Sequence, residues 1–231
     1  MPNNFDISIL MSINKFSELS LLFDHFVVLI QNNYLFKGGV LIPLIYYIWF
    51  KATQTDNNRQ RLIATLLITL PADLLARILG KTLPFRIRPI HDAAIHFLPP
   101  DSMYLKTLEG NSSFPSDHAV LFFCLSAGLF FCSKRIGLFA FIYTLIFIAF
   151  PRLYLGLHYP TDIIAGFVIG VLFAFIANHF LVNSKLVAAI NQWCYSKPEF
   201  FYPLFFIFTC EIFEMFGSSR ALVTTLISYI H

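Results

Sequence analysis

The sequence predicts an all-α protein built as a polytopic membrane helix bundle. Of its 231 residues, 57% are hydrophobic and only 13% are charged, whereas about a quarter of the residues in soluble domains are charged. The mean hydropathy is +0.69, and several apolar stretches approach the roughly 20 residues that a spanning helix needs. This composition excludes an ordinary soluble domain and also a disordered chain, which would be polar and highly charged.

Six apolar stretches form the predicted core of the bundle, residues 1–182. The first contains Asp24 and His25, so it either crosses the membrane or lies along its surface. The second ends in Tyr46, Tyr47 and Trp49, aromatic residues that are typical of a membrane interface. In chain order, the six stretches cover residues 16–31, 35–50, 62–79, 119–132, 136–150 and 163–182.

The sixth stretch is the most continuous of these predicted spans. Gly166 and Gly170 are four residues apart in it, a spacing that lets a second helix approach closely. Residues 183–231 then form a hydrophobic C-terminal extension of unknown role, broken at Gly217. We expect this extension to add one more span or a re-entrant hairpin. The N-terminal residues lack the features of a cleaved signal peptide, so insertion without cleavage is expected.

Lys and Arg residues in the short connections predict the orientation of the bundle. If the spans alternate, three basic connections share one side, which we assign to the cytoplasm. These connections carry Lys51, Arg59 and Arg61, then Lys134 and Arg135, then Lys185 and Lys197. The connections 80–117 and 151–162 then lie outside the cytoplasm and hold most of the chemistry. The net charge of +3 is too small to indicate nucleic acid as a partner.

The first two clusters in the outer connections suggest an anion site. Lys81 is followed after six residues by Arg88 and Pro89, although cations at the end of a span can simply reach toward the interface. The second cluster is Pro-Ser-Asp-His, with Ser116, Asp117 and His118 directly before an apolar helix. A serine here is typical of a helix cap, but the free N–H groups of a helix N-terminus also bind phosphate.

The third cluster contains Arg152, His158 and Asp162 at spacings of six and four residues. At the start of a helix, a carboxylate four residues after a histidine can hydrogen-bond the imidazole and fix its tautomer. A single His–Asp pair is more often structural. Three clusters in this order, with these spacings, change that balance in favour of a phosphate-processing site.

Together the clusters resemble the three signature motifs of the type 2 phosphatidic acid phosphatase (PAP2) superfamily. The resemblance implies a six-span PAP2-like core and hydrolysis of phosphate esters or anhydrides without a metal or other cofactor. It also implies the roles of individual residues. His158 would be the nucleophile, Asp162 its orienting partner and His118 the general acid. The residues implied to hold the substrate's phosphoryl oxygens are Lys81, Arg88, Ser116, Arg152 and, through nearby backbone N–H groups, Asp117.

The sequence departs from the general family pattern at two positions. Asp117 replaces the usual glycine of the second motif, and a carboxylate beside His118 should favour the protonated form that donates a proton. Pro151 replaces the usual serine before Arg152, which removes a possible phosphate donor. The Pro-Ser-Asp-His motif resembles that of bacterial undecaprenyl-diphosphatases. This resemblance implies a polyprenyl diphosphate substrate and a multi-pass protein of the bacterial inner membrane with its site outside the cytoplasm.

Asp73, Arg77 and Lys81 lie at intervals of four residues, on one face of the predicted helix that precedes the first motif. Charged groups inside a membrane are costly and are usually paired or functional. We therefore expect Asp73 and Arg77 to pair and to orient Lys81, although a purely structural ion pair explains the pattern equally well. Arg86 lies outside the motif pattern, and it either guides anions or contacts lipid head groups.

Two other kinds of catalytic site fit the sequence less well. Compact zinc-ligand spacing is absent, so a metal site made from His91, Asp92, His96 and Asp101 is disfavoured. A hydrolase triad of Ser116, His158 and Asp162 would need the GxSxG turn, which the sequence lacks. The four cysteines have neither zinc-site nor disulfide-scaffold spacing.

Three alternative functions remain open at this stage. One is a broader lipid phosphatase that acts on phosphatidate, phosphatidylglycerophosphate or lipid A. Another is a phosphotransferase, and the third is a lipid transporter without catalytic activity. The expected partners are a lipid phosphate or diphosphate and the membrane, and the sequence does not indicate an oligomeric state.

Overall fold

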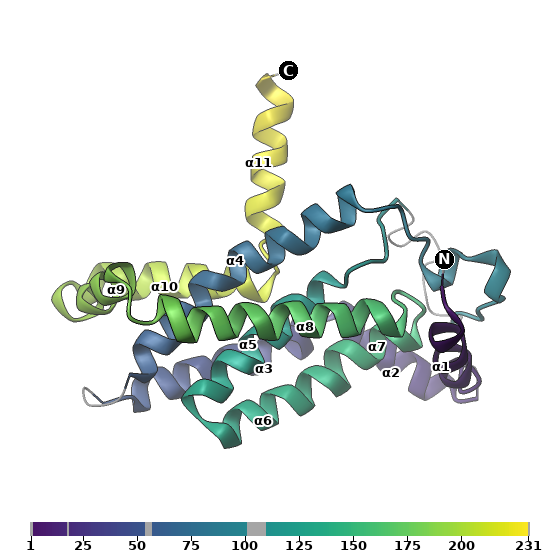
Figure 1. The fold of residues 1–231 in the computed structure, drawn as a ribbon, viewed down its shortest axis with the longest axis horizontal. Coiled ribbons are helices and arrows are strands. Elements are labelled where there is room, and N and C mark those ends of the chain that lie inside the picture. The colour runs from purple at the N-terminus through teal and green to yellow at the C-terminus, as the bar shows by residue number, and fades with distance from the viewer. Residues whose placement is uncertain (1, 18, 54–56, 101–109, 231) are drawn as a thin grey trace.

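The computed structural model describes residues 2–17, 19–53, 57–100 and 110–230, and these residues form helices and connections without a β-strand (Figure 1). The prediction of an all-α bundle is confirmed. The helices are α1 Asn4–Asn14, α2 Leu21–Asn32, α3 Tyr34–Lys51, α4 Asn58–Thr82, α5 Asp117–Cys132, α6 Lys134–Tyr143, α7 Phe150–Tyr154, α8 Pro160–Ile176, α9 Lys185–Ser196, α10 Pro198–Phe213 and α11 Gly217–Ile230. π-Helical turns at Thr144–Ala149 and Ala177–Leu181 follow α6 and α8.

Helix α5 lies at the centre of the bundle and packs against α4, α6 and α8. After its first two residues it carries no charged side chain, and the stretch from Ala119 to Leu129 is buried. A helix that is apolar on all sides can be enclosed in this way without leaving charges unpaired. The second motif therefore opens directly onto the buried core of the molecule.

Helix α8 approaches α5 closely at its two glycines, as predicted from their spacing. A Cβ atom on Gly166 would lie 2.5 Å from the Ala119 Cβ and 2.8 Å from the Ser116 carbonyl oxygen. A Cβ atom on Gly170 would lie 2.4 Å from the Val120 carbonyl oxygen. Because α5 begins at the second motif and α8 carries Asp162 of the third, this contact brings two motifs together.

Among the described residues, three helical stretches are long and apolar enough to cross a membrane: Asn58–Thr82, Lys134–Tyr154 and Pro160–Leu181. The pair α2 and α3 passes the same test only together, with a bend of 57°, and so does the pair α10 and α11, with a bend of 87°. Residues 16–31, which were expected either to span or to lie along the surface, and the span predicted over 35–50 therefore meet as one bent pair, a broken span or a re-entrant loop. The 12 residues of α2 reach only about 18 Å, too short for the hydrocarbon core.

The C-terminal extension covers part of the core through α9 and α10, which pack on α4 and α3 respectively. Trp49 was predicted to lie at the membrane interface, but it is fully buried. Its ring centroid lies 4.7 Å from that of Phe205 and 5.5 Å from that of Phe201, both on α10. The prediction failed because the sequence of residues 35–50 alone does not show that a later helix, α10, covers Trp49. Helix α11 projects away from the bundle (Figure 1).

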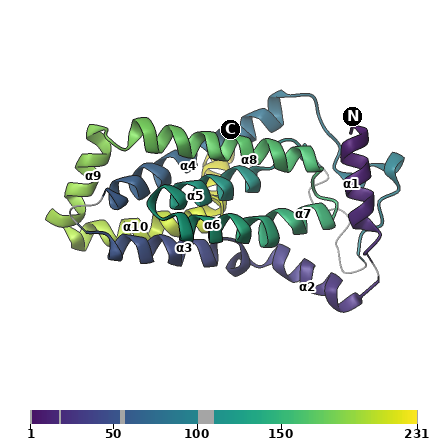
Figure 2. The same cartoon turned by 60° about the horizontal axis from the view of Figure 1, so that its bottom comes forward.

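The two ends of the bundle differ in character. The α3–α4 connection, the α5–α6 turn and α9 lie at one end, and α1, α7 and the start of α8 lie at the other (Figures 1 and 2). The first end carries the basic connections that the sequence assigned to one side. The second end carries the third motif.

Candidate active site

Backbone hydrogen bonds tie the three motif segments together. The Ser113 N–H donates to the Arg86 carbonyl over 2.8 Å, and the Ser116 N–H donates to the Asp162 carbonyl over 3.3 Å. The Ile90 N–H donates to the Gly156 carbonyl over 2.9 Å. The segments after α4, before α5 and before α8 therefore hold one another in place.

His158 sits in the α7–α8 connection and is only 3% exposed. Its Nδ1 lies 2.7 Å from the Ser113 carbonyl oxygen, which can only accept a hydrogen bond, so Nδ1 carries the proton. Nε2 therefore carries the lone pair, which accepts a hydrogen bond from Arg88 Nη1 over 3.3 Å. Burial lowers the pKa of His158 below its ordinary value of 6.5, and the charges of Arg88 and Arg152 act in the same direction. This environment keeps the imidazole neutral.

Asp162 is completely buried, and its Oδ2 lies 3.7 Å from His158 Nδ1. The predicted pair is thus present at ion-pair distance, while the imidazole proton points to the Ser113 carbonyl. Asp162 also accepts hydrogen bonds from Ser113 Oγ, from Arg86 Nη1 and, over 2.8 Å, from the Tyr159 N–H. Ser113 therefore contacts both members of the pair, through its carbonyl and its hydroxyl.

Two motif arginines are buried near the nucleophile candidate. Arg88 is held by carbonyl groups, with Nη1 2.7 Å from Leu157 O and Nη2 3.1 Å from Ser112 O. Arg152 donates through Nη1 to Gln31 Oε1 over 2.9 Å. Its Nη2 is buried without a hydrogen-bond partner among the described residues. A buried guanidinium nitrogen without an acceptor is costly, and a phosphoryl oxygen would satisfy it.

The second motif begins α5 as the sequence indicated. Ser116 is the N-cap, and its Oγ accepts from the Ala119 N–H over 3.4 Å. Asp117 Oδ1 accepts from the His118 backbone N–H over 2.8 Å and lies 2.9 Å from His118 Nδ1. An Nδ1 proton directed at the carboxylate leaves Nε2 of His118 as the nitrogen that exchanges a proton with substrate.

The expected ion pair on α4 is present, but it points to the second motif. Arg77 Nε lies 2.7 Å from Asp73 Oδ2, and Arg77 Nη2 lies 3.3 Å from Asp117 Oδ2. The chain of contacts therefore runs from Asp73 through Arg77 and Asp117 to His118. The prediction that this pair orients Lys81 has no support in these contacts. Lys81 is exposed on the last turn of α4, so its side chain is free to meet a ligand from outside.

Arg86 is a structural partner of the third motif, which corrects the expectation that it guides anions or contacts head groups. It donates to Asp162, to Thr161 Oγ1 over 2.9 Å and to Asp6 Oδ2 over 2.5 Å. Asp6, on α1, also accepts from the Thr161 N–H over 2.9 Å. No motif or spacing in the sequence pointed to Asp6, Ser113 or Gln31, because each contacts the site across a large separation along the chain.

The residues of the disfavoured metal site are used differently. Asp92 accepts from the Tyr159 hydroxyl over 3.0 Å and from the Ala94 N–H over 3.1 Å. Asp101 lies outside the described residues. Within the part of the chain that the structure describes, no group of three His, Cys, Asp or Glu side chains is arranged to hold a metal ion.

Residues 61–186, more than half of the chain, match the model of the PAP2 superfamily. The chain belongs to the PAP2 superfamily. The matched region contains all three motifs, so the predictions of the family, of a membrane phosphatase and of the phosphoric ester hydrolase class are confirmed. The protein is a multi-pass membrane protein, as the apolar helices and the family together indicate.

Two curated relatives bear names that refer to bacitracin transport or to an undecaprenyl-diphosphatase. The chain is 28% identical over 177 residues to the Bacitracin transport permease protein BcrC of Bacillus licheniformis. The aligned residues cover 69% of this chain and 79% of that relative. It is 29% identical over 109 residues to the Undecaprenyl-diphosphatase BcrC of Bacillus subtilis, covering 47% of this chain and 52% of the relative.

Two solved structures share the PAP2 fold. The crystal structure of Aquifex aeolicus LpxE has a TM-score of 0.56 and 24% sequence identity, covering 77% of this chain and 97% of that one. A PAP2-type phosphatidylglycerolphosphate phosphatase from Bacillus subtilis has a TM-score of 0.53 and 23% identity, covering 78% and 86%. At these identities the comparison establishes the fold alone.

Proposed function

We propose that this PAP2 protein hydrolyses a polyprenyl diphosphate such as undecaprenyl diphosphate, through a phosphohistidine intermediate. The observation that carries the proposal is the His158 environment: a neutral imidazole with its Nε2 lone pair beside Arg88, in a buried site where Arg152 Nη2 lacks an acceptor. The Pro-Ser-Asp-His motif and the relative named as an undecaprenyl-diphosphatase favour this substrate.

In the first step, His158 Nε2 attacks the terminal phosphorus, and the bond from that phosphorus to the bridging oxygen breaks. The leaving group is the lipid monophosphate, and His118 donates a proton to its departing oxygen. In the second step, His118 removes a proton from water, which attacks the phosphohistidine. Inorganic phosphate leaves, and both histidines return to their starting protonation states. Asp162 and the Ser113 carbonyl keep the His158 imidazole in the required orientation.

Charge stabilisation in this mechanism comes from cationic side chains. A phosphoryl transition state spreads negative charge over its equatorial oxygens, so positioned cations are the main catalytic requirement. Arg88 and Arg152 supply buried guanidinium groups, and Lys81 supplies an exposed ammonium at the end of α4. The Ser116 hydroxyl and the N–H groups at the start of α5 add hydrogen bonds. We infer that no metal or other cofactor is needed.

The site lies at helix ends, which suits a lipid substrate. The head group can reach the water interface while the apolar tail stays between helices. The basic connections at the opposite end of the bundle favour a cytoplasmic location for that end. We therefore place the active site outside the cytoplasm, in a protein of the bacterial inner membrane.

Two other functions are favoured by particular names among the similar proteins. The fold relative titled a phosphatidylglycerolphosphate phosphatase favours a broader lipid phosphatase, which would discharge the same phosphohistidine to water. With another acceptor the enzyme would be a phosphotransferase. The relative named as a bacitracin transport permease favours a transport function instead. Transport alone does not require His118, His158 and Asp162 in this arrangement.

The test is phosphate release by the purified protein in detergent, with EDTA present. Undecaprenyl diphosphate, phosphatidate and phosphatidylglycerophosphate are compared for the wild type and for His158→Ala. The proposal predicts preferential release from the diphosphate that the substitution abolishes. Release from the monoesters alone would favour the broader phosphatase. No release from any lipid by folded protein would contradict hydrolysis of these substrates.

A further inference from the structure

The buried Arg152 side chain of the third motif is held at one of its terminal nitrogens. The residue is 2% exposed, and its Nη1 donates to Gln31 Oε1 over 2.9 Å and to the Ile148 carbonyl over 3.1 Å. Each terminal nitrogen of a guanidinium carries two protons, so these two oxygens use both protons of Nη1. Nη2 has no hydrogen-bond partner among the described residues, and its protons remain for a ligand.

Main-chain hydrogen bonds tie Arg152 to the proposed nucleophile. The Arg152 carbonyl accepts from the Leu157 N–H over 2.9 Å and from the His158 N–H over 3.3 Å. The backbone of Arg152 therefore keeps its place relative to His158. The direction of the guanidinium, at the far end of a long side chain, depends instead on the groups that bind Nη1. Ile148 lies only four residues earlier, so Gln31 is the distant anchor.

Helix α2 brings Gln31 to this position by lying against α7. Asp24, Val27 and Gln31 recur at intervals of three and four residues, which places them on one face of α2. The Tyr154 hydroxyl donates to Asp24, and Val27 packs in the same apolar cluster as Tyr154. One face of α2 therefore holds both Tyr154 and, one turn further along the helix, Arg152.

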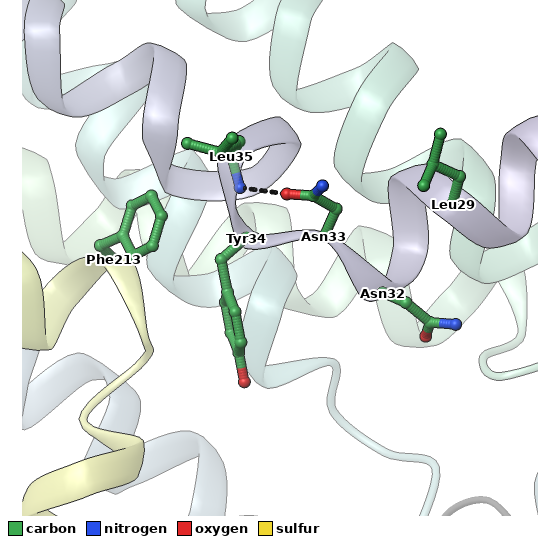
Figure 3. Close-up of a pocket in the computed structure, with 6 residues that line it drawn as sticks. All are labelled: Leu29, Asn32, Asn33, Tyr34, Leu35 and Phe213. Atoms are coloured by element: carbon green, nitrogen blue, oxygen red, sulfur yellow. Dashed lines mark hydrogen bonds between the residues drawn. The ribbon is translucent and has the colours of Figure 1, made fainter.

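Helix α2 ends one residue after Gln31, at the break that leads to α3. Asn33 Oδ1 accepts from the Leu35 N–H over 2.8 Å and caps α3, as Figure 3 shows. Asn32 is exposed and is one of the residues that line a surface hollow at this break. Two consecutive amides of α2 therefore have different surroundings, because Gln31 binds a buried arginine and Asn32 faces the hollow.

The arginines around the site differ in the charge of the groups that hold them. Arg86 is bound by two carboxylates, Asp6 and Asp162, which compensate its charge within the protein. Arg152 forms hydrogen bonds only with neutral oxygens, and Arg88 only with carbonyl oxygens and the neutral His158 ring. The two arginines of the motifs therefore keep their charge for a ligand.

A neutral oxygen and a carboxylate at the place of the Gln31 amide would affect Arg152 differently. Either accepts the hydrogen bond from Nη1, but a carboxylate also compensates the positive charge. We propose that Gln31 is a positioning residue, whose uncharged amide fixes the Arg152 guanidinium and leaves its charge and its Nη2 to the substrate's phosphoryl group. This inference rests on the proposed function. It gives α2, which precedes the region 61–186 that matches the family, a part in the site.

The test measures calorimetrically how tightly the purified full chain in detergent binds inorganic phosphate. Gln31→Glu keeps an oxygen acceptor at the same place and adds a negative charge, so it should weaken phosphate binding about 10-fold or more. The unfolding midpoint should stay at or above that of the wild type, because the hydrogen bond to Arg152 is kept. A merely structural anchor would leave phosphate binding unchanged in this variant, and that result would refute the role.

Asn32→Asp is the matched control for the added charge. It also converts an amide to a carboxylate, one residue later on the same helix, but at an exposed position. Solvent screens such a charge, so phosphate affinity should change by less than about twofold. Equal weakening by Asn32→Asp and Gln31→Glu would show that a charge on α2 acts without the contact to Arg152, and would overturn the proposal.

A second substitution keeps the test decisive if Gln31→Glu does not fold. Gln31→Met has a similar length but offers no oxygen acceptor, so Arg152 loses an anchoring hydrogen bond without gaining a compensating charge. Phosphate binding should weaken about three- to tenfold. Wild-type phosphate affinity in Gln31→Met would refute the positioning role.

Phosphate binding separates this inference from the proposed function, because it does not require any lipid to be cleaved. Weaker binding by Gln31→Glu than by the wild type supports the role of Gln31 even if undecaprenyl diphosphate is not a substrate. Equal kcat/KM of both proteins for undecaprenyl diphosphate would refute that role while the proposed function holds. A wild-type chain that binds no phosphate would contradict Arg152 as an anion ligand, and with it the role of Gln31.

Discussion

His158 is buried beside cationic side chains, and this environment determines the pH dependence that we expect. Its pKa lies below 6.5, mainly because of burial. The nucleophile must be neutral, so the acid limb of kcat/KM should lie below pH 6.5. Arg88→Met removes one charge that lowers this pKa and should move the limb to higher pH, along with lowering the rate. pH–rate profiles of both proteins check this, and a wild-type limb at or above pH 6.5 would contradict it.

The same shift has a consequence for folding. Because the imidazole binds a proton less readily in the folded protein, the unfolded chain takes up more protons as the pH falls below 6.5. Stability contributed by neutral His158 is therefore present above pH 6.5 and decreases as the pH falls through that value.

Asp117 replaces a glycine of the general motif, and Arg77 gives this replacement a defined partner. Arg77 holds the carboxylate that contacts His118, so Arg77→Leu should lower kcat several-fold. In an Asp117→Gly background the same change should have little further effect. The double-mutant cycle should give a coupling free energy of about 1 kcal/mol. Additive effects of the two substitutions would show that Arg77 acts independently of Asp117.

At the scale of helices, the α5–α8 contact aligns the second and third motifs. Gly166→Ala should destabilise the protein by about 1–3 kcal/mol, because its Cβ would overlap Ala119 and the Ser116 carbonyl. Gly39→Ala on α3 is the control, since its Cβ would meet neighbours no closer than 3.4 Å. Thermal unfolding in detergent measures both. Equal stability of Gly166→Ala and the wild type would argue against this close contact.

The N-terminal helix supports the third motif through Asp6. The buried carboxylate of Asp6 binds Arg86 and Thr161, next to Asp162. Asp6→Asn leaves Arg86 with one carboxylate instead of two, and we expect lower kcat and a lower unfolding midpoint. Asp6→Glu should recover part of both. If Asp6→Asn has wild-type kcat and midpoint, α1 does not support the site.

The sequence predicted the elements of the site better than the contacts between them. Spacing within a motif correctly predicted that His158 and Asp162 lie close together, because His158 directly precedes the N-cap of α8 and Asp162 lies on the first turn of that helix. The Gly166 and Gly170 spacing correctly predicted a close helix contact. Asp6, Ser113 and Gln31 were missed because their roles depend on how distant segments meet. Trp49 was misplaced for the same reason, since an apolar face toward lipid and one toward another helix have the same sequence pattern.

At the scale of the whole molecule, the α7–α8 connection of the proposed site and the basic connections α3–α4 and α5–α6 lie at opposite ends of the bundle (Figure 1). In the proposed function, this arrangement places the buried cations at one membrane surface, where they meet a head group while the lipid tail remains among the helices. The division into a catalytic core of residues 1–182 and an extension of 183–231 stays a prediction. In the structure, α9 and α10 pack against the same main hydrophobic cluster as α3 and α4.

The proposed mechanism requires that His158 becomes phosphorylated during turnover. The most direct measurement is rapid quenching of the purified protein with undecaprenyl diphosphate labelled on its terminal phosphate, followed by mapping of the labelled peptide. The phosphohistidine mechanism predicts an acid-labile, base-stable label on His158. The label should persist longer in His118→Ala, which lacks the base that activates water, and should be absent from His158→Ala. Turnover without any labelled enzyme, or a label on another residue, would contradict the proposed mechanism.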